Sequence, residues 1–292
     1  MTSTKKQPST SFRLLIEYDG RRYHGWQRQG TLAKPYPQQG TLAKPYPQQG
    51  AAQSATGVKT IAGAIDRVLH LAGVKILNLT GAGRTDSGVH ALGQVAHIHL
   101  AHPIKSFELH QILEQGLPYD IAVPHIEPCP PDFDARHDAI SRTYLYQIAL
   151  RKSAFTKNHT WWPKAPLDLP LLNETWSLFE GNHSMAAFAD LEAGENPRCQ
   201  IYDCHSKTSG HILLLRVTAR FFLRRQVRRM VGAVVQCAAG NVEIDRIAGD
   251  IKAPSKKSAL YWAEKTAPAS GLFLESVGYG SEHDSVSRAV QF

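Results

Sequence analysis

Asp86 is the residue of this chain whose type and surroundings are best suited to chemistry. It stands in TGAGRTDSGVHALGQ, residues 80–94, among four glycines and directly after an apolar run. An Asp in a glycine-rich segment can simply prepare a turn. Glycine also lets another molecule approach the backbone closely. The segment is therefore a candidate site for a reaction that needs a carboxylate.

Two further chemistries are suggested by residues near Asp86. Ser87 and His90 are the nucleophile and base types of a hydrolase, but the segment lacks the G-x-S-x-G turn and no second stretch resembles an oxyanion loop. His97 and His99 alternate on a predicted strand, so they share a face and could hold a metal. No third ligand follows at a suitable spacing, so we expect a polar strand face and no metal.

A basic segment, FFLRRQVRRMVGAVVQ, has helical periodicity. Its apolar stripe consists of Leu223, Val227, Met230, Val231 and Val234. This pattern predicts Arg225 and Arg229 on the far side and places Arg224 and Arg228 at the edges of the stripe. The arginines can form a solvated basic face. An Arg at the edge of the stripe can also enter a half-buried cleft and bind a carboxylate through two parallel hydrogen bonds.

Tyr144 and Tyr146 alternate in SRTYLYQI and therefore share one face of a predicted strand. Aromatic rings in this arrangement can fill a core. They can also stack on a nucleobase. The two tyrosines thus admit a structural and a binding interpretation.

The elements that must position these residues repeat a single order. Before residue 130 the periodicity predicts strands at 12–17, 75–80, 94–100 and 120–127 and helices at 60–73 and 106–116, the second capped by Ser106. After residue 137 it predicts strands at 141–150, 198–206, 211–220 and 271–279 and helices at 167–181 and 222–238, the first running from a cap at Asp168 to a stop at Gly181. Each order is β-α-β-β-α-β, the ferredoxin-like unit.

These patterns predict an α+β fold in which two ferredoxin-like halves share a mixed, largely antiparallel sheet with a central cleft. We expect a disordered N-terminus at 1–11, halves at 12–130 and 137–280, and a tail at 281–292. Residues 30–59 form an insertion in the first half and contain TLAKPYPQQG twice in succession, at 31–50. Because Pro and Gln favour an extended, solvated chain, the repeat is predicted to be a surface loop.

Composition limits the class of protein. The 33 Lys and Arg residues exceed the 25 Asp and Glu residues, for a net charge of +8, which suits a polyanionic partner. The four cysteines show no C-x-x-C spacing and are expected to be reduced thiols of a cytoplasmic protein. The polar N-terminus is no signal peptide, and no stretch has the length of a membrane span.

Five ordered blocks resemble one family, the TruA family of tRNA pseudouridine synthases. The blocks are EYDGRRYHGWQRQ (17–29), GAGRTDSGVHALGQVAH (81–97), FDARHDAISRTYLYQI (133–148), FLRRQVRRMVG (222–232) and TAPASGLFLESVGY (266–279). One departure is that 30 residues lie between Gln29 and Thr60, where the family reaches its first helix after a few. The departure leaves the other blocks intact.

The resemblance implies an enzyme that isomerises uridine to pseudouridine at positions 38 to 40 of the tRNA anticodon arm, without metal or cofactor. It implies a cytoplasmic homodimer in which one tRNA touches both subunits. Carried over by position, it implies that Asp86 is the nucleophile and Arg84 a supporting basic group, that Arg228 pairs with Asp86, that Tyr144 contacts the target base, and that Leu272 packs beneath the uracil.

Pseudouridine formation breaks the N1–C1′ bond and rejoins the uracil through C5, so no redox carrier is needed. The carboxylate could attack C1′, add to C6 or remove the 2′ hydrogen, and the sequence leaves these routes open. The base must leave its stack, and we expect the glycines around Asp86 to make room for it. The alternative is an RNA-binding module on the same fold without activity.

Overall fold

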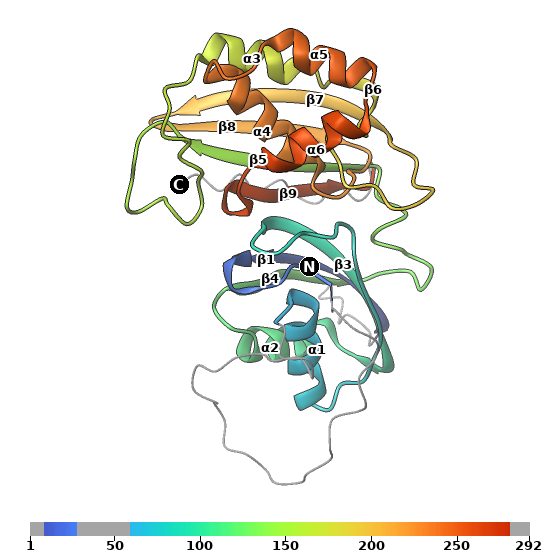
Figure 1. Ribbon diagram of the computed structural model, residues 1–292. Helices are drawn as coiled ribbons and strands as arrows, with labels where there is room; N and C mark the ends of the chain where they lie inside the picture. The colour runs from blue at the N-terminus through green and yellow to red at the C-terminus, as the bar shows by residue number, and fades with distance from the viewer. Residues whose placement is uncertain (1–8, 28–58, 281–292) are drawn as a thin grey trace. The chain divides into compact units, whose positions relative to one another are not determined.

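The computed structural model describes residues 9–27 and 59–280, drawn with their element labels in Figure 1. These residues form two compact units. The first holds the chain up to Gly88 together with Val95–Arg136, and the second holds Val89–Gln94 together with the chain from His137 onward. The 31–50 repeat, the 281–292 tail and most of the predicted disordered N-terminus lie outside the described residues.

The first unit is a sheet with two helices. Its elements are β1 (Ser9–Tyr18), the short 3-10 helix η1 (Gly20–Arg22), α1 (Ile61–Leu71), β2 (Ile76–Gly81), β3 (His90–Ile104), α2 (Ser106–Gly116) and β4 (Ile121–Pro128). The strand order is β4-β1-β3, with β2 antiparallel to β3. Figure 1 shows α1 and α2 side by side against this sheet. This is the predicted β-α-β-β-α-β order.

The periodicity of apolar residues explains how this unit forms its core. Phe12, Leu14 and Ile16 alternate along β1 and are fully buried. The α1 helix begins where the Thr60 hydroxyl accepts the Gly63 N–H, 3.2 Å away. Burying one strand face and one helical stripe of this kind is the dominant stabilising contribution in a domain of this size.

The second unit carries more elements than the repeat predicts. They are β5 (Ser141–Ala149), α3 (Leu169–Ser177), β6 (Gly181–Ser184), β7 (Arg198–Ser209), β8 (Ile212–Ala219), α4 (Gln226–Ala238), α5 (Ile244–Lys252), α6 (Lys256–Glu264), the short 3-10 helix η2 (Ala269–Gly271) and β9 (Leu272–Gly278). The strand order is β9-β5-β8-β7-β6, all antiparallel. The start of β3 also belongs to this unit, where His90 and Ala91 pair with β9 in parallel. In Figure 1, α4 and α6 lie over the strands, and α3 and α5 lie next to β7 and β6.

Several boundaries differ from the prediction. Lys105 precedes α2 as its cap, and Ser106 is the first helical residue. The α3 helix ends at Ser177, and Gly181 is the first residue of β6 and not a helix stop. The predicted helix at 222–238 begins only at Gln226. The mixed, mostly antiparallel α+β class is confirmed.

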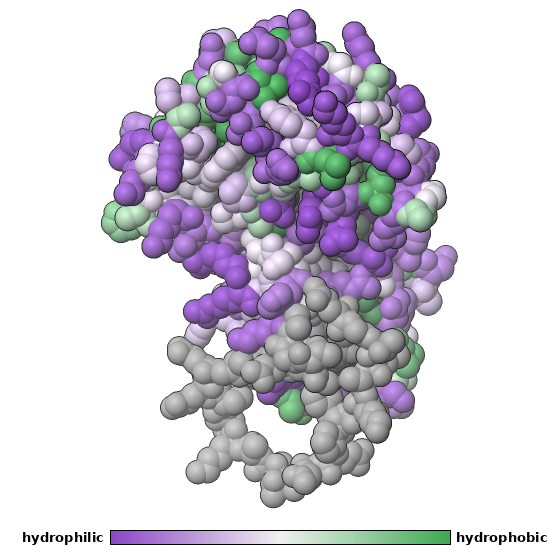
Figure 2. Space-filling view, viewed as in Figure 1, coloured by the Kyte–Doolittle hydropathy of each residue, from purple (hydrophilic) through white to green (hydrophobic). Residues whose placement is uncertain are grey.

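The surface of the second unit agrees with the polar composition of the chain. Figure 2 shows that the visible face of the second unit is mainly hydrophilic, with hydrophobic side chains gathered over and beside α6. Leu260 on α6 is one of the exposed large apolar residues. Among the described residues, every helix is too short or too polar to cross a membrane.

Candidate active site

Asp86 lies in the loop between β2 and β3 of the first unit, and the backbone before it is firmly held. The Thr85 side chain is buried, and its hydroxyl lies 2.8 Å from the Tyr18 hydroxyl. The Thr85 carbonyl accepts the Trp26 N–H at 3.2 Å. Asp86 itself is half-buried. Thr85 is buried, and its hydroxyl and its carbonyl both have hydrogen-bond partners. The backbone from which the Asp86 side chain extends is therefore fixed in position.

The residues after Asp86 are held by the same neighbouring segment. The Ser87 hydroxyl and the Gly88 N–H both donate to the Tyr23 carbonyl at 3.2 Å. Gly25 has a φ of +89°, and a Cβ at this position would collide with the Thr85 carbonyl. The 23–26 segment therefore packs against the backbone of the Asp86 loop at a distance that only glycine permits.

Two glycines of the motif have a different role from the one predicted. A Cβ on Gly81 would come within 2.5 Å of the Trp26 ring, and one on Gly93 would come within 2.5 Å of the Glu275 carbonyl. In each case the glycine and the residue it contacts belong to the same unit. The expectation that the motif glycines make room for a nucleotide is therefore wrong for these two, whose space is taken by protein atoms.

Arg84 is exposed in the same loop as Asp86.

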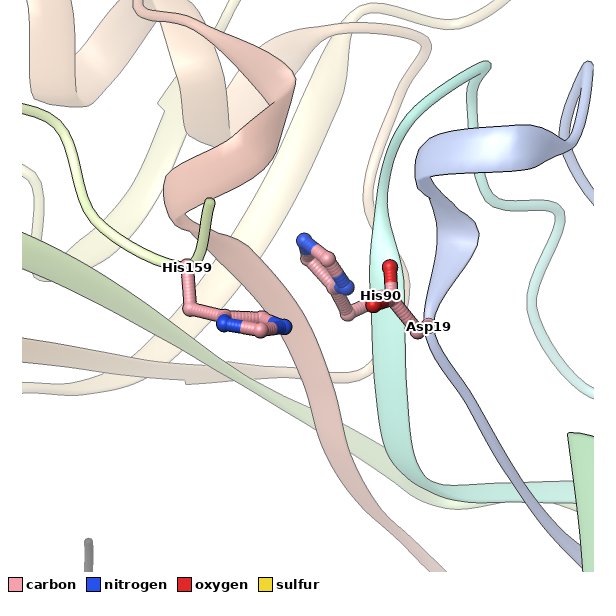
Figure 3. Close-up of side chains that lie close together, drawn as sticks. All are labelled: Asp19, His90 and His159. Atoms are coloured by element: carbon pink, nitrogen blue, oxygen red, sulfur yellow. The ribbon is translucent and has the colours of Figure 1, made fainter. Parts of the chain in front are cut away.

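The hydrolase interpretation is not supported, because the Ser87 hydroxyl proton is donated to a carbonyl rather than to a base. His90 is the first residue of β3, only 1% exposed, and its ring stacks on Phe273 with centroids 4.6 Å apart. Figure 3 shows it near the ring of His159, 5.0 Å away between centroids. His90 thus packs among aromatic rings.

His97 and His99 share a strand face, as predicted, and both are used structurally. His97 Nδ1 accepts the Ala135 N–H at 2.9 Å, and its Nε2 lies 3.0 Å from the Asn78 side-chain amide. His99 Nδ1 lies 3.0 Å from the Ser11 hydroxyl. A metal on His97 would have to displace one of these contacts.

Tyr144, Tyr146 and Leu272 form one face of the second unit. Leu272 lies opposite Tyr146 in the β5–β9 ladder, and directly opposite residues point to the same side. The Tyr146 hydroxyl donates to the Pro268 carbonyl at 2.8 Å. Tyr144 is 8% exposed and meets Phe222 edge to face, with centroids 5.2 Å apart. Burial raises the pKa of the Tyr146 phenol, which keeps it protonated and able to donate.

Arg228 is tied to the chain that leads into β9. Its Nε donates to the Ala267 carbonyl at 2.8 Å, and its own carbonyl accepts the Ala267 N–H at 3.0 Å. A Cβ on Gly232, one turn along α4, would collide with the Lys265 carbonyl. Lys265–Gly271, which we term the strap, therefore contacts both Arg228 and Tyr146 and leads directly into Leu272.

Arg229 corrects the prediction for α4. It was expected on the solvated far side with Arg225, but it is only 4% exposed. Its guanidinium donates to the Ala189 carbonyl at 2.7 Å and forms an ion pair with Asp190. Burial lowers the pKa of the Arg229 guanidinium, and the Asp190 charge opposes this. The pattern failed because an anionic partner lay 39 residues away in the sequence.

Arg225 shares the Asp190 carboxylate, with Nη1 3.3 Å from Oδ2. It has a φ of +60°, a left-handed conformation that L-residues other than glycine rarely adopt. The left-handed residue explains why α4 starts four residues later than its periodicity predicts. The sequence analysis assigned no role to Asp190, Gly25 or the strap, although Gly25 and most of the strap lie in the blocks 17–29 and 266–279. Their importance arises from tertiary contacts, which leave no periodic signal in the sequence.

Of the predicted site residues, Asp86 and Arg84 belong to the first unit, and Tyr144, Arg228 and Leu272 belong to the second. Both units match a family of known proteins. A profile of the family described as tRNA pseudouridine synthase matches residues 14–138 and 176–280. These ranges contain all of the five site residues except Tyr144.

Curated relatives match over most of their length. The protein described as tRNA pseudouridine synthase A of Dictyoglomus thermophilum is 34% identical over 232 residues, which cover 78% of this chain and 93% of the relative. The protein of the same description from Agrobacterium fabrum is 32% identical over 274 residues, covering 92% of each chain. That of Sinorhizobium fredii is 32% identical over 275 residues, covering 92% of this chain and 99% of the relative.

Proposed function

This chain belongs to the tRNA pseudouridine synthase family and is an isomerase that acts on tRNA, and from this premise we propose that Asp86 is its nucleophile and the anticodon arm its target. The reaction converts uridine to pseudouridine at positions 38 to 40. The bond between N1 and C1′ breaks, the uracil turns, and a bond forms between C5 and C1′. The hydrogen on C5 is lost to solvent and N1 gains a proton, so nothing is oxidised.

The observation that carries this proposal is the way the first unit holds the Asp86 loop. Thr85, Ser87 and Gly88 are all hydrogen-bonded to the 18–26 part of the chain, and Gly25 lies directly against Thr85. A carboxylate on such a backbone loses little freedom when the substrate arrives, which favours catalysis by position. A carboxylate that merely prepares a turn would not need this support.

The second unit supplies what the detached base requires. Tyr144 and Leu272 are apolar surfaces of a size suited to holding a flipped uracil. Both are fixed, Leu272 by the β5–β9 ladder and Tyr144 by its contact with Phe222. We propose that Tyr144 contacts the target base and that Leu272 packs beneath it, so that the uracil is retained while it turns.

Arg228 and Arg84 are proposed as the basic groups of the reaction. Arg228 is assigned to pair with the Asp86 carboxylate, which would keep the carboxylate ionised. Its Nε donates to the Ala267 carbonyl, which ties the Arg228 side chain to the strap. Arg84, exposed in the Asp86 loop, is assigned a supporting role toward the phosphates beside the target. We further propose that the enzyme is a cytoplasmic homodimer, as the family resemblance implies.

Incubation with unmodified tRNA transcripts tests the proposal. Carbodiimide treatment followed by primer extension would map any pseudouridine to a single position. We expect stops at positions 38 to 40, and none in a matched transcript that carries cytidine there. Pseudouridine elsewhere in the tRNA would contradict the target. Binding without any pseudouridine would favour the alternative of an inactive RNA-binding module.

A further inference from the structure

We propose that Arg220–Arg225 of the second unit is an RNA-docking loop, in which the Phe221 ring stacks on an unpaired base while Arg220 and Arg224 contact the flanking phosphates. The loop joins β8 to α4. This inference rests on the proposed function, since it names a contact for the same RNA substrate.

The backbone of the docking loop is fixed by groups that lie behind it. Arg142, itself buried, donates from Nη1 to the Arg220 carbonyl at 2.7 Å. The Cys199 thiol donates to the Phe221 carbonyl at 2.9 Å. Burial raises the pKa of this thiol to about 11, so it keeps its proton. The Asp190 N–H donates to the Arg224 carbonyl at 2.9 Å.

The side chains of the docking loop divide between the core and solvent. Phe222 faces Tyr144, and Leu223 is buried. Phe221, by contrast, is 40% exposed. The rigid backbone therefore holds a large apolar ring at the surface, where burying it would have been favourable. A surface ring that loses little entropy on binding is a suitable platform for stacking a base.

The arginines in and beside the docking loop also fall into two groups, those that form an ion pair and those that do not. Asp190 forms ion pairs with Arg225 and Arg229. Among the described residues, no ion pair is formed by the exposed Arg220 or Arg224. The carboxylate thus neutralises Arg225, the last residue of the loop, and Arg229 in α4, and leaves Arg220 and Arg224 available for phosphates. Basic side chains close to an exposed aromatic ring are typical of single-stranded RNA sites.

Direct binding measurements with Phe221 variants test the stacking contact. Three RNA probes are used in filter binding: the tRNA transcript, an anticodon-arm hairpin and a blunt duplex of equal length. We expect Phe221→Leu to weaken tRNA and hairpin binding by roughly tenfold and to leave duplex binding unchanged, because only unpaired bases can stack. Phe221→Tyr should bind like the wild type. Phe155→Leu, at a 95% exposed ring of the same unit, is the matched control.

Salt titrations test the phosphate contacts. Arg220→Gln and Arg224→Gln should each reduce the slope of log K against log salt by roughly 0.7 to 0.9, the value for one lost phosphate contact. Lys256→Gln, at an exposed residue of α6, should leave the slope unchanged. Thermal melting checks that each variant is folded. A wild-type slope for both arginine variants, or wild-type hairpin affinity for Phe221→Leu, would overturn the inference.

The docking loop and the proposed function can fail independently of each other in these experiments. If the wild type forms no pseudouridine but Phe221→Leu still weakens hairpin binding, the proposed function fails and the docking loop stands. If pseudouridine forms and Phe221→Leu binds normally, the docking loop is refuted and the proposed function stands.

Discussion

Gly25 contributes to the site because it has no side chain, and not because it carries a reactive group. Its φ of +89° favours glycine, and its missing Cβ lets the 23–26 segment touch Thr85, the residue before Asp86. This contact would be lost with any larger residue. The position of the Asp86 carboxylate therefore depends on a residue that carries no functional group.

We predict that Gly25→Ala lowers both stability and turnover. Gly73 is the matched control, because its φ is +74° and no atom lies within 4 Å of its added Cβ. Gly73→Ala should cost only the left-handed strain, about 1 kcal/mol, with turnover unchanged. Gly25→Ala should cost at least about twice as much in urea unfolding and reduce single-turnover rates more than tenfold. Equal effects of the two substitutions would show that the Thr85 contact is unimportant.

Arg228 offers a second test of position. Arg228→Met should reduce turnover strongly and tRNA affinity little, because one Arg that orients a carboxylate contributes less to RNA binding than several phosphate contacts do. Arg228→Lys should restore only part of the rate, since an ammonium cannot make two parallel hydrogen bonds. Equal losses of turnover and filter-binding affinity in Arg228→Met would instead identify Arg228 as an RNA contact.

The start of α4 shows how an element is set by distant partners. Asp190 pairs with the buried Arg229 and the partly exposed Arg225, and its N–H holds the Arg224 carbonyl. Removing a partner from a buried charge is costly, whereas exposed pairs contribute little. The carboxylate thus stabilises this end of the helix chiefly through Arg229.

We predict that Asp190→Asn destabilises the protein by about 2 kcal/mol, since it leaves the Arg229 charge buried without an anion. Arg225→Met, at the 44% exposed partner of the same carboxylate, should cost less than about 1 kcal/mol. The double variant Asp190→Asn with Arg229→Met should recover much of the loss, because the buried charge is then absent. Additive losses in chemical denaturation would contradict this account.

Sequence periodicity predicted the elements whose stability depends on an apolar stripe. The β1 alternation, the α3 cap at Asp168 and the β5 face of Tyr144 and Tyr146 are all found as expected. Periodicity could not reveal that Arg229 is buried, because its carboxylate partner lies on another segment. It also missed α5 and α6, although Ser255 caps α6 through the Ser258 N–H.

The candidate site was only partly predictable for the same reason. The motif around Asp86 and the resemblance predicted candidate residues with functional groups, and their roles stay predictions. The supporting contacts, such as Gly25 against Thr85 and the strap against Arg228 and Tyr146, join segments far apart in sequence. Local patterns do not encode such distances. The assigned pairing of Arg228 with Asp86 stays a prediction.

For the protein as a whole, the 31–50 repeat is the main departure from the family pattern. It lies outside the described residues, and its Pro- and Gln-rich composition can bury little apolar surface. We predict that deleting one ten-residue copy changes the melting temperature by less than about 3 °C, equivalent to about 1 kcal/mol at this size. A larger shift in calorimetry would show that the repeat packs against the protein.

The reaction as proposed also requires no metal, since the carboxylate is the nucleophile and nothing is oxidised. We predict that pseudouridine formation persists in excess chelator, after dialysis of protein and tRNA, provided the tRNA is kept folded with monovalent salt. Loss of activity that zinc alone restores would contradict this prediction. Restoration by magnesium would require a control for tRNA folding, such as its melting profile under the same conditions.

The central claim is that Asp86 is the nucleophile, and single-turnover pseudouridine formation with saturating enzyme tests it most directly. Asp86→Asn keeps the shape of the side chain and removes its charge. Asp132→Asn, at an exposed position of the same unit, is the control. We predict no detectable product with Asp86→Asn, at tRNA affinity within about twofold of the wild type, and normal rates with Asp132→Asn. Near-normal product formation by Asp86→Asn would contradict the account.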